Sequence, residues 1–425
     1  MPSASSAPSP PDAGSDRERR IIFLIGAVQF INVLDFVMVM PLGPDFARAL
    51  GIPASHLGIV GGSYTAAAAI AGVIGSLFLD RFDRRKALGY TLLGLVLGTA
   101  LGGLAWDLPS LIAARVVAGS FGGPATSIAG AIIADAVPPE RRGRAMGAVM
   151  GAFSVASVFG IPLGLELARL GGWQLPFFAV AALGLVVTAL ALRLMPPMTS
   201  HLAQPIPRAQ TPLTLLRRPV VLLSLTGGGC LMFANFALIP NLSAYFQFNL
   251  GYPRAQLGLL YLCGGTISFL TMRLAGKTAD RIGPTRTAAL GTMAYVVVLL
   301  GGFVHPLAGL PVLVLFVCFM VTSSFRMVAV QTLTTRVPAA RERARFMSLQ
   351  SCVQHLASAA GAMFASQLLI TRSDGGLVGM DSVATVSALL AASVPVLMGL
   401  IEPRVQQRES TERSAQALQR DSVPV

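Results

Sequence analysis

Two opposite charges stand inside long apolar segments: Asp35 in "VLDFVMVMPLG", residues 33–43, and Arg115 in "LIAARVVAGSFGG". At membrane depth an ionisable side chain costs about 2.5–3.5 kcal/mol on insertion scales, so such residues usually pair or serve a function. Each lies about 12 Å along a helix from its outer end, near Gly43 and Asp107, so we expect both at one depth. A carboxylate held between burial and a guanidinium can bind and release protons. We therefore predict a proton-coupling pair; the open alternative is an ion pair that only orders the helices.

Six further polar residues lie within apolar segments and are candidates for binding a substrate. They are Gln29, Asn32, Asn235, Arg326, Gln354 and His355. Arg326 has no intramembrane acid in its half of the chain, so it could bind an anionic substrate group or be a structural arginine. His355 could titrate near neutral pH, although a lone histidine in a helix can equally be a hydrogen-bonded packing residue.

The segments that position these residues have the length and composition of membrane-spanning helices. The 425 residues are 54% hydrophobic and only 12% charged, with a mean hydropathy of +0.68. So few charges cannot cover a soluble protein of this size. A bilayer core takes about 20 apolar residues per helix, and we predict twelve such spans. They cover residues 21–43, 56–79, 87–106, 109–136, 144–168, 173–195, 219–247, 255–276, 285–304, 309–335, 344–370 and 382–401.

The location of the basic residues predicts the orientation in the membrane. A net charge of +13 could indicate a nucleic-acid partner. If residue 1 is cytoplasmic and the spans alternate, however, most of the 32 Lys and Arg residues fall in cytoplasmic loops. The arginines of the outer loops are Arg48, Arg169, Arg254 and Arg372. This bias places both termini in the cytoplasm and argues against nucleic acid as a partner.

An internal repeat divides the chain into two halves. "GSLFLDRFDRRKAL" and "RLAGKTADRIGPTRTAAL" place Asp80 and Asp280 two hundred residues apart, and the same offset relates Pro138 to Pro338. We predict two parallel six-helix bundles, residues 21–195 and 219–401, joined by a polar cytoplasmic linker, 196–218. The polar ends, 1–20 and 402–425, are expected to be disordered tails, and the first of them lacks the apolar core of a cleaved signal peptide.

At this point the sequence resembles the major facilitator superfamily over roughly residues 21–401. The loop between the second and third spans resembles the signature motif of that family, with Asp83 where glycine is usual. "LIAARVVAGSFGG" is similar to the fourth-helix motif with an intramembrane arginine, and "FGIPLGLELARLGGW" to a fifth-helix Gly-Pro motif of exporters. The motif residues, including the second copy of the loop, are Gly75, Asp80, Arg81, Arg84, Arg85, Gly160, Pro162, Gly164, Gly276, Asp280, Arg281 and Gly283.

The resemblance implies an all-α integral membrane protein with the major facilitator fold and twelve transmembrane helices. It further implies a proton-coupled exporter of a small organic molecule, similar to the twelve-helix drug:proton antiporters. The loop charges around Asp80 and Asp280 would lock the two halves together on the cytoplasmic side when the protein opens outward. Solvated loop charges are the alternative for these two residues.

Other classes of function lack their motifs in this sequence. "AGKTAD" resembles a nucleotide-binding loop, but Thr271 stands where that loop needs a glycine, and an apolar helix precedes it. We expect no enzyme, no cofactor and no metal site. We expect a monomer in a cell inner (plasma) membrane whose partners are a small-molecule substrate, protons and the lipid bilayer. The remaining alternatives are an importer or uniporter of a sugar or small metabolite, and a membrane sensor that does not transport.

Overall fold

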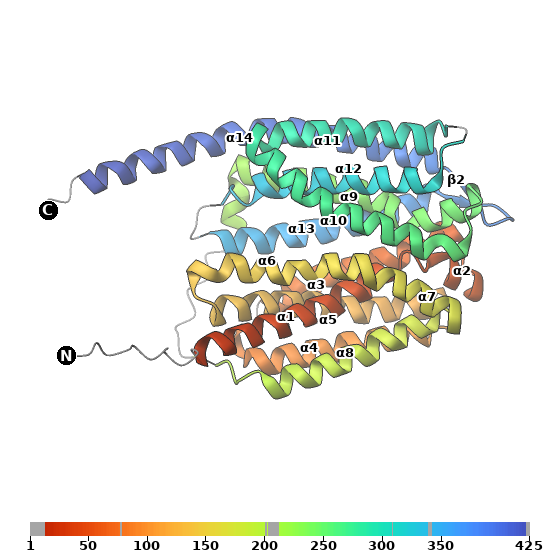
Figure 1. Cartoon of the computed structure of the whole chain (residues 1–425), viewed down its shortest axis with the longest axis horizontal. Helices are drawn as coiled ribbons and strands as arrows, with labels where there is room; N and C mark the ends of the chain where they lie inside the picture. The colour runs from red at the N-terminus through yellow and green to blue at the C-terminus, as the bar shows by residue number, and fades with distance from the viewer. Residues whose placement is uncertain are drawn as a thin grey trace, which may run out of the picture.

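The computed structural model describes residues 13–76, 79–199, 202, 212–307, 309–338 and 342–421. Long, roughly parallel helices form two bundles that lie side by side (Figure 1). Helix α1 begins and α14 ends at one end of the molecule, which we call the terminal face. The other end, where α2 and the strand β2 lie, is called the far face.

The N-terminal bundle contains six membrane-length rods, one of them built from three consecutive helical pieces. The long helices are α1 (Ala13–Met38), α3 (Leu57–Ser76), α4 (Arg84–Gly103), α5 (Leu108–Ala136), the rod α6 (Pro139–Val155), η3 (Ala156–Gly160) and α7 (Ile161–Gly171), and α8 (Gln174–Leu194). The short pieces are α2 (Gly43–Leu50), η1 (Ala54–His56) and η2 (Leu79–Arg81).

The C-terminal bundle repeats this order. Its long helices are α9 (Pro219–Ala244) with η6 (Tyr245–Asn249), α10 (Leu257–Ile282), α11 (Pro284–Leu299) with η8 (Leu300–Val304), α12 (Val312–Thr334), α13 (Arg343–Leu368) and α14 (Met380–Asp421). The short pieces are η5 (Pro212–Arg217), η7 (Arg254–Gln256) and the antiparallel strands β1 (Ile370–Thr371) and β2 (Leu377–Val378).

Eleven helices of the described chain are long and apolar enough to cross a membrane. The twelfth rod is α13, which has 26 residues and packs against α9 and α3. Helix α13 is more polar than the other eleven, because its sequence includes Arg343, Arg345, Gln350 and Gln354. The predicted all-α fold with twelve transmembrane helices is therefore confirmed, with one two-residue strand pair added at the far face.

Local signals explain the chain turns directly before α4 and α11. Asp83, which replaces the usual glycine, caps α4, because its Oδ1 accepts hydrogen bonds from the backbone N of Arg85 at 2.9 Å and of Met198 at 3.1 Å. The equivalent Gly283 has φ +91°, a conformation that glycine adopts without strain, and ends α10. The two copies of the loop therefore turn by different means.

The rod α6–η3–α7 has an identifiable irregularity. Pro162 has no N–H to continue the helical ladder, and a π-helical turn, Ala156–Gly160, lies directly before it. Gly160 allows close approach here, because a Cβ on it would stand 2.6 Å from the Leu34 side chain of α1. Gly164 has no neighbour within 4 Å of such a Cβ, so of these two motif glycines only Gly160 lies close to a neighbouring helix.

The ends of the chain differ from the predicted disordered tails. Helix α1 already includes residues 13–20, whereas residues 1–12 lie outside the described chain. Helix α14 continues through 402–421. The extension is held against the end of α12, because Arg408 donates to the backbone oxygens of Val337 at 2.6 Å and Arg336 at 2.7 Å. Arg336 also pairs with Glu409, which raises the pKa of the guanidinium.

Candidate transport site

Asp35 and Arg115 form a buried ion pair in the N-terminal bundle. Their side chains are 0% and 1% exposed, and Arg115 Nη1 lies 3.0 Å from Asp35 Oδ1. Arg115 Nη2 donates to Asp35 Oδ2 at 3.2 Å, so the guanidinium engages both carboxylate oxygens. Thr99 of α4 donates its hydroxyl to Asp35 Oδ1 at 2.7 Å. The predicted depth match is confirmed, and three helices contribute to one charged cluster.

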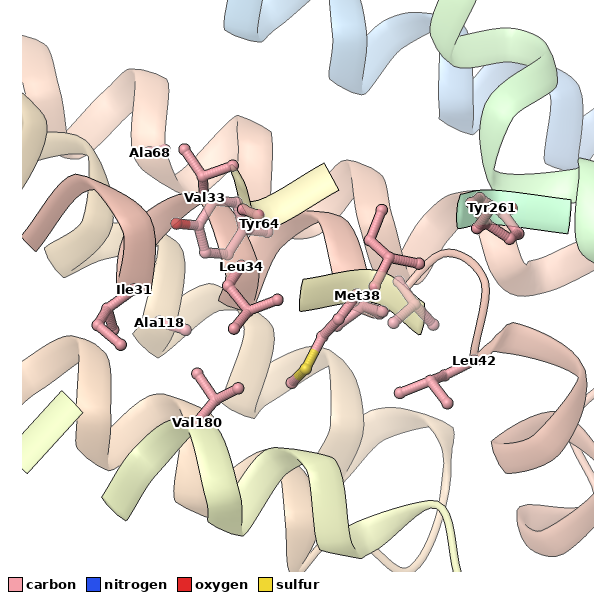
Figure 2. Close-up of a cluster of buried hydrophobic side chains, with 14 of the residues drawn as sticks. Ile31, Val33, Leu34, Met38, Leu42, Tyr64, Ala68, Ala118, Val180 and Tyr261 are labelled. Carbon is pink, nitrogen blue, oxygen red and sulfur yellow. The ribbon is translucent and has the colours of Figure 1, made fainter. Parts of the chain in front are cut away.

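Tyr64 of α3 covers this ion pair. The Arg115 guanidinium carbon lies 4.5 Å from the centroid of the Tyr64 ring, a cation–π contact. The Tyr64 hydroxyl donates to Asn32 Oδ1 at 2.8 Å. Figure 2 shows Tyr64 next to Val33 and Ala68 in the apolar cluster that surrounds this region. The ion pair is therefore enclosed by an aromatic ring and by aliphatic side chains.

An aromatic stack joins the cluster to the other bundle. The Phe36 and Tyr64 rings are stacked with centroids 5.2 Å apart, and the Phe36 and Phe236 rings with centroids 5.8 Å apart. Phe36 follows Asp35 directly in α1, whereas Phe236 belongs to α9 of the C-terminal bundle. A movement at the ion pair can therefore reach the interface between the bundles through two ring contacts.

Both Phe36 and Phe236 line a cavity of about 330 Å³ between the two bundles. Its wall combines aromatic rings, methionines and a small number of uncharged polar groups, as is typical of small-molecule sites. The other aromatic residues and the methionines of the wall are Phe153, Tyr261, Phe269, Phe316, Phe319, Met40, Met232, Met272, Met320 and Met327. The remaining polar residues of the wall are Thr65, Ser154, Ser157, Asn235, Ser268, Gln354, His355 and Ser358.

The structure brings three of the six predicted binding residues to this cavity. Asn235, Gln354 and His355 line it, from α9 and α13. Gln29 and Asn32 are not among its lining residues. Asn32 is instead occupied inside the N-terminal bundle, where its Nδ2 donates to the Gly122 backbone oxygen at 2.8 Å.

Arg326 is also absent from the cavity wall. It is fully buried, and its guanidinium carbon lies 4.1 Å from the centroid of the Tyr295 ring, between α12 and α11. Its guanidinium nitrogens have no hydrogen-bond partner among the described residues. This position separates Arg326 from the space between the bundles, although its neighbour Met327 lines the cavity.

The predicted residues of the two loop copies lie at the terminal face. Gly75 allows close packing, because a Cβ on it would stand 2.8 Å from the Leu79 side chain. Arg84 pairs with Asp135 of α5, and Arg85 donates to the Met195 backbone oxygen at 3.1 Å.

The other residues of the two motif copies are less constrained by their neighbours. Arg81, Asp280 and Arg281 are exposed, and Gly276 has open space around it. The Asp80 side chain lies outside the described part of the structure.

The two bundles touch at the far face. Arg254 Nε lies 2.8 Å from Asp45 Oδ1, and the backbone N of Ser55 donates to Thr371 Oγ1 at 2.9 Å. Gly58 of α3 lies so close to α13 that a Cβ on it would stand 2.2 Å from the Ala362 backbone oxygen. These contacts close the cavity toward the far face.

In the part of the terminal face that the structure describes, the salt bridges join residues of the same bundle. Among the described residues, Glu18 pairs with Arg141 in the N-terminal bundle, and Arg218 pairs with Glu342 in the C-terminal bundle. The structure therefore holds the bundles together by polar contacts at the far face.

Two residues of the cluster were absent from the sequence prediction. Tyr64 is the single aromatic residue in "GGSYTAAAAIAG". One large side chain among small ones was an available signal of a specific contact. Thr99 carried no such signal, because threonines commonly bond their own helix, as Thr99 also does to the Leu95 backbone oxygen at 2.8 Å.

Comparisons with known proteins agree with this architecture. A chloramphenicol resistance protein from Streptomyces lividans is 26% identical over 245 residues, 57% of this chain and 62% of that protein. A probable sugar efflux transporter from Pasteurella multocida (strain Pm70) is 23% identical over 273 residues, 63% of this chain and 65% of that protein. The chain thus spans less than two thirds of the length of these relatives.

Solved structures share the fold over nearly the whole chain. A bacterial homolog of the human lysosomal transporter Spinster, in an inward-facing and unoccupied conformation, superposes with a TM-score of 0.68 at 16% sequence identity, covering 91% of this chain and 95% of that one. Residues 25–416 match the sequence profile of the Major Facilitator Superfamily. Together with the twelve helices in two bundles, this match shows that the chain belongs to the major facilitator superfamily of membrane transporters.

Proposed function

We propose that this transporter exports a small, largely apolar aromatic molecule in exchange for protons. The observation that carries the proposal is the continuous contact from the Asp35–Arg115 pair through Tyr64 and Phe36 to the cavity wall. It connects an ionisable group to the surface that a substrate would touch.

Protonation of Asp35 has a direct energetic consequence for this cluster. The proton neutralises the carboxylate and leaves Arg115 as a buried cation without a full counter-charge. Breaking a buried ion pair costs about 3–5 kcal/mol, which favours any rearrangement that hydrates the guanidinium. Tyr64 would have to move with Arg115 because its ring lies against the guanidinium.

Substrate binding acts on the same contacts from the other side. A molecule in the cavity touches Phe36, whose ring is stacked on Tyr64. Coupling is reciprocal: if the proton lowers the affinity for substrate, the substrate lowers the affinity for the proton by the same factor. Exchange of one for the other follows, with the two bundles rocking about the cavity.

The wall of the cavity favours an aromatic or amphiphilic molecule over a sugar. Phenylalanine and methionine side chains dominate it, and the described residues that line it include no Asp, Glu, Lys or Arg. A sugar needs many paired hydrogen-bond groups, because each unpaired polar group in such a site costs about 1–3 kcal/mol. The relative named for chloramphenicol resistance therefore supplies the first probe.

The side of the membrane on which the closed face lies follows from the orientation that the basic residues predict. With both termini in the cytoplasm of a cell whose inner (plasma) membrane holds the protein, the far face is external. The contacts at Asp45, Ser55 and Gly58 then form the outer closure. One chain contains both bundles and the cavity between them, so we propose that the monomer is sufficient for transport.

Proteoliposomes with an imposed pH gradient test the proposal. Wild type is expected to concentrate chloramphenicol, or another aromatic amphiphile of a small panel, against its own gradient. Asp35→Asn should lose this gradient response and keep downhill exchange. Glu166→Gln, a matched loss of an exposed carboxylate from α7, should behave as wild type. Concentration of substrate by Asp35→Asn would refute the coupling role.

A further inference from the structure

A different cavity, polar and of about 550 Å³, lies at the terminal face of the N-terminal bundle, away from the transport site. Four arginines from three helices converge on it, and we call it the four-arginine pocket. Its lining residues are Arg17, Arg20 and Ile21 of α1, Arg85 of α4, Arg193 and Leu194 of α8, and the following Met195, Pro196 and Pro197.

The pocket has no acid among the described residues that line it. Two neighbouring acids, Glu18 and Asp83, are engaged elsewhere, and the exposed Asp16 is not among the lining residues. Glu18 pairs with Arg141 at 2.9 Å, and Asp83 accepts hydrogen bonds from the backbone N of Arg85 and of Met198. Arg85 Nη1 donates to a backbone oxygen, while its Nε is buried without a partner among the described residues. Four like charges therefore face one space with no counter-charge in its wall.

The equivalent place in the C-terminal bundle contains its own anion. The repeat offset relates Arg85 to Thr285 at the start of α11. There Glu402 of α14 accepts a hydrogen bond from the Thr285 backbone N at 3.2 Å. Each bundle thus supplies a carboxylate to this backbone N, Asp83 in the N-terminal bundle and Glu402 in the C-terminal bundle. The two places differ in the side chain that follows, because Arg85 faces the four-arginine pocket where the C-terminal bundle has Thr285.

We propose that the four-arginine pocket binds the phosphate of an anionic glycerophospholipid in the leaflet at the terminal face. Arginine presents paired N–H donors that match phosphate oxygens. Basic pockets between transmembrane helices are suited to such headgroups. The exposed Leu194 side chain of the wall matches the glycerol and the upper acyl chain. The lipid would join α1, α4 and α8 at their ends and brace the bundle that contains Asp35.

Thermal unfolding of the purified full chain in detergent, followed with a thiol-reactive dye on its four free cysteines, provides the assay. Dioleoylphosphatidylglycerol should raise the melting temperature of wild type more than dioleoylphosphatidylcholine does. In Arg20→Gln/Arg193→Gln the apparent affinity for phosphatidylglycerol should fall by about thirtyfold, given about 1 kcal/mol for each arginine near an anionic lipid.

Two control variants make the test specific. Arg144→Gln/Arg286→Gln removes the same charge from exposed positions of the terminal face outside the pocket and should keep the wild-type lipid response. Arg20→Lys/Arg193→Lys preserves the charge and should recover most of the response, which separates the pocket from a folding defect. These readouts do not depend on transport, so they can fail independently of the proposed function.

Three results would overturn the proposal. Equal responses to the two lipids would remove the headgroup preference. An equal loss in the pocket variant and in Arg144→Gln/Arg286→Gln would reduce the effect to surface charge. Stabilisation of wild type by inorganic phosphate alone, as large as that by phosphatidylglycerol, would assign the pocket to a free anion and exclude the lipid.

Discussion

Gly58→Ala is expected to open the far face. The added Cβ would stand 2.2 Å from the Ala362 backbone oxygen and 2.5 Å from Ser366 Oγ, both in α13. A backbone oxygen cannot rotate away, so α3 and α13 must separate. Overpacking of this kind costs about 1–3 kcal/mol, and only the conformation with α3 against α13 bears that cost. The equilibrium should shift toward a far-face-open state by about 5- to 150-fold.

Gly72→Ala is the matched control on the same helix, because a Cβ there has no neighbour within 4 Å. The assay is a distance measurement between spin labels at Ala49→Cys and Ala255→Cys, in a variant whose four native cysteines are replaced by serine. Both positions are exposed at the far face, one in each bundle. Gly58→Ala should add a population at longer distance, whereas Gly72→Ala should match the parent. Identical distance distributions for the two variants would refute the role of the Gly58 contact.

Three further perturbations follow from individual ion pairs of the structure. Arg254→Gln should open the far face only slightly, by about 1 kcal/mol or less, because the pair with Asp45 is 22% and 18% exposed; the same spin labels should show a shift that shrinks with added salt. Arg115→Met should lower the melting temperature strongly, because it leaves the buried Asp35 carboxylate unpaired at a cost of about 3–5 kcal/mol. An unchanged melting temperature would contradict the buried ion pair. Glu409→Gln should accelerate amide hydrogen exchange in 402–411 by weakening the contact with Arg336, while exchange in α4 stays constant.

The axial position of side chains was predictable from the sequence, whereas their direction around each helix was not. A fixed rise per residue placed Asp35 and Arg115 at one depth, and the structure pairs them. Depth alone could not tell which face of a helix meets the cavity. Asn235 faces it, but Arg326 points to Tyr295 and Asn32 to Gly122.

Repeat symmetry predicted the two bundles but not the differences between the two copies. The two copies form this turn differently: Asp83 caps the next helix with its side chain, whereas Gly283 adopts a positive φ. The extension of α14 was missed because it depends on tertiary contacts. Its polar composition matches a tail in isolation, and the helix is stabilised by contacts of Arg408 and Glu409 with residues 336 and 337, which composition does not reveal.

The most direct test of the coupling by Asp35 is proton release from the purified protein when a substrate binds. Chloramphenicol or another aromatic amphiphile is added to wild type and to Asp35→Asn in weakly buffered detergent solution, with binding measured separately by calorimetry. We predict that wild type releases protons in proportion to the ligand bound, and that Asp35→Asn binds ligand and releases none. Equal release from both proteins, or binding to wild type without any release, would contradict the account.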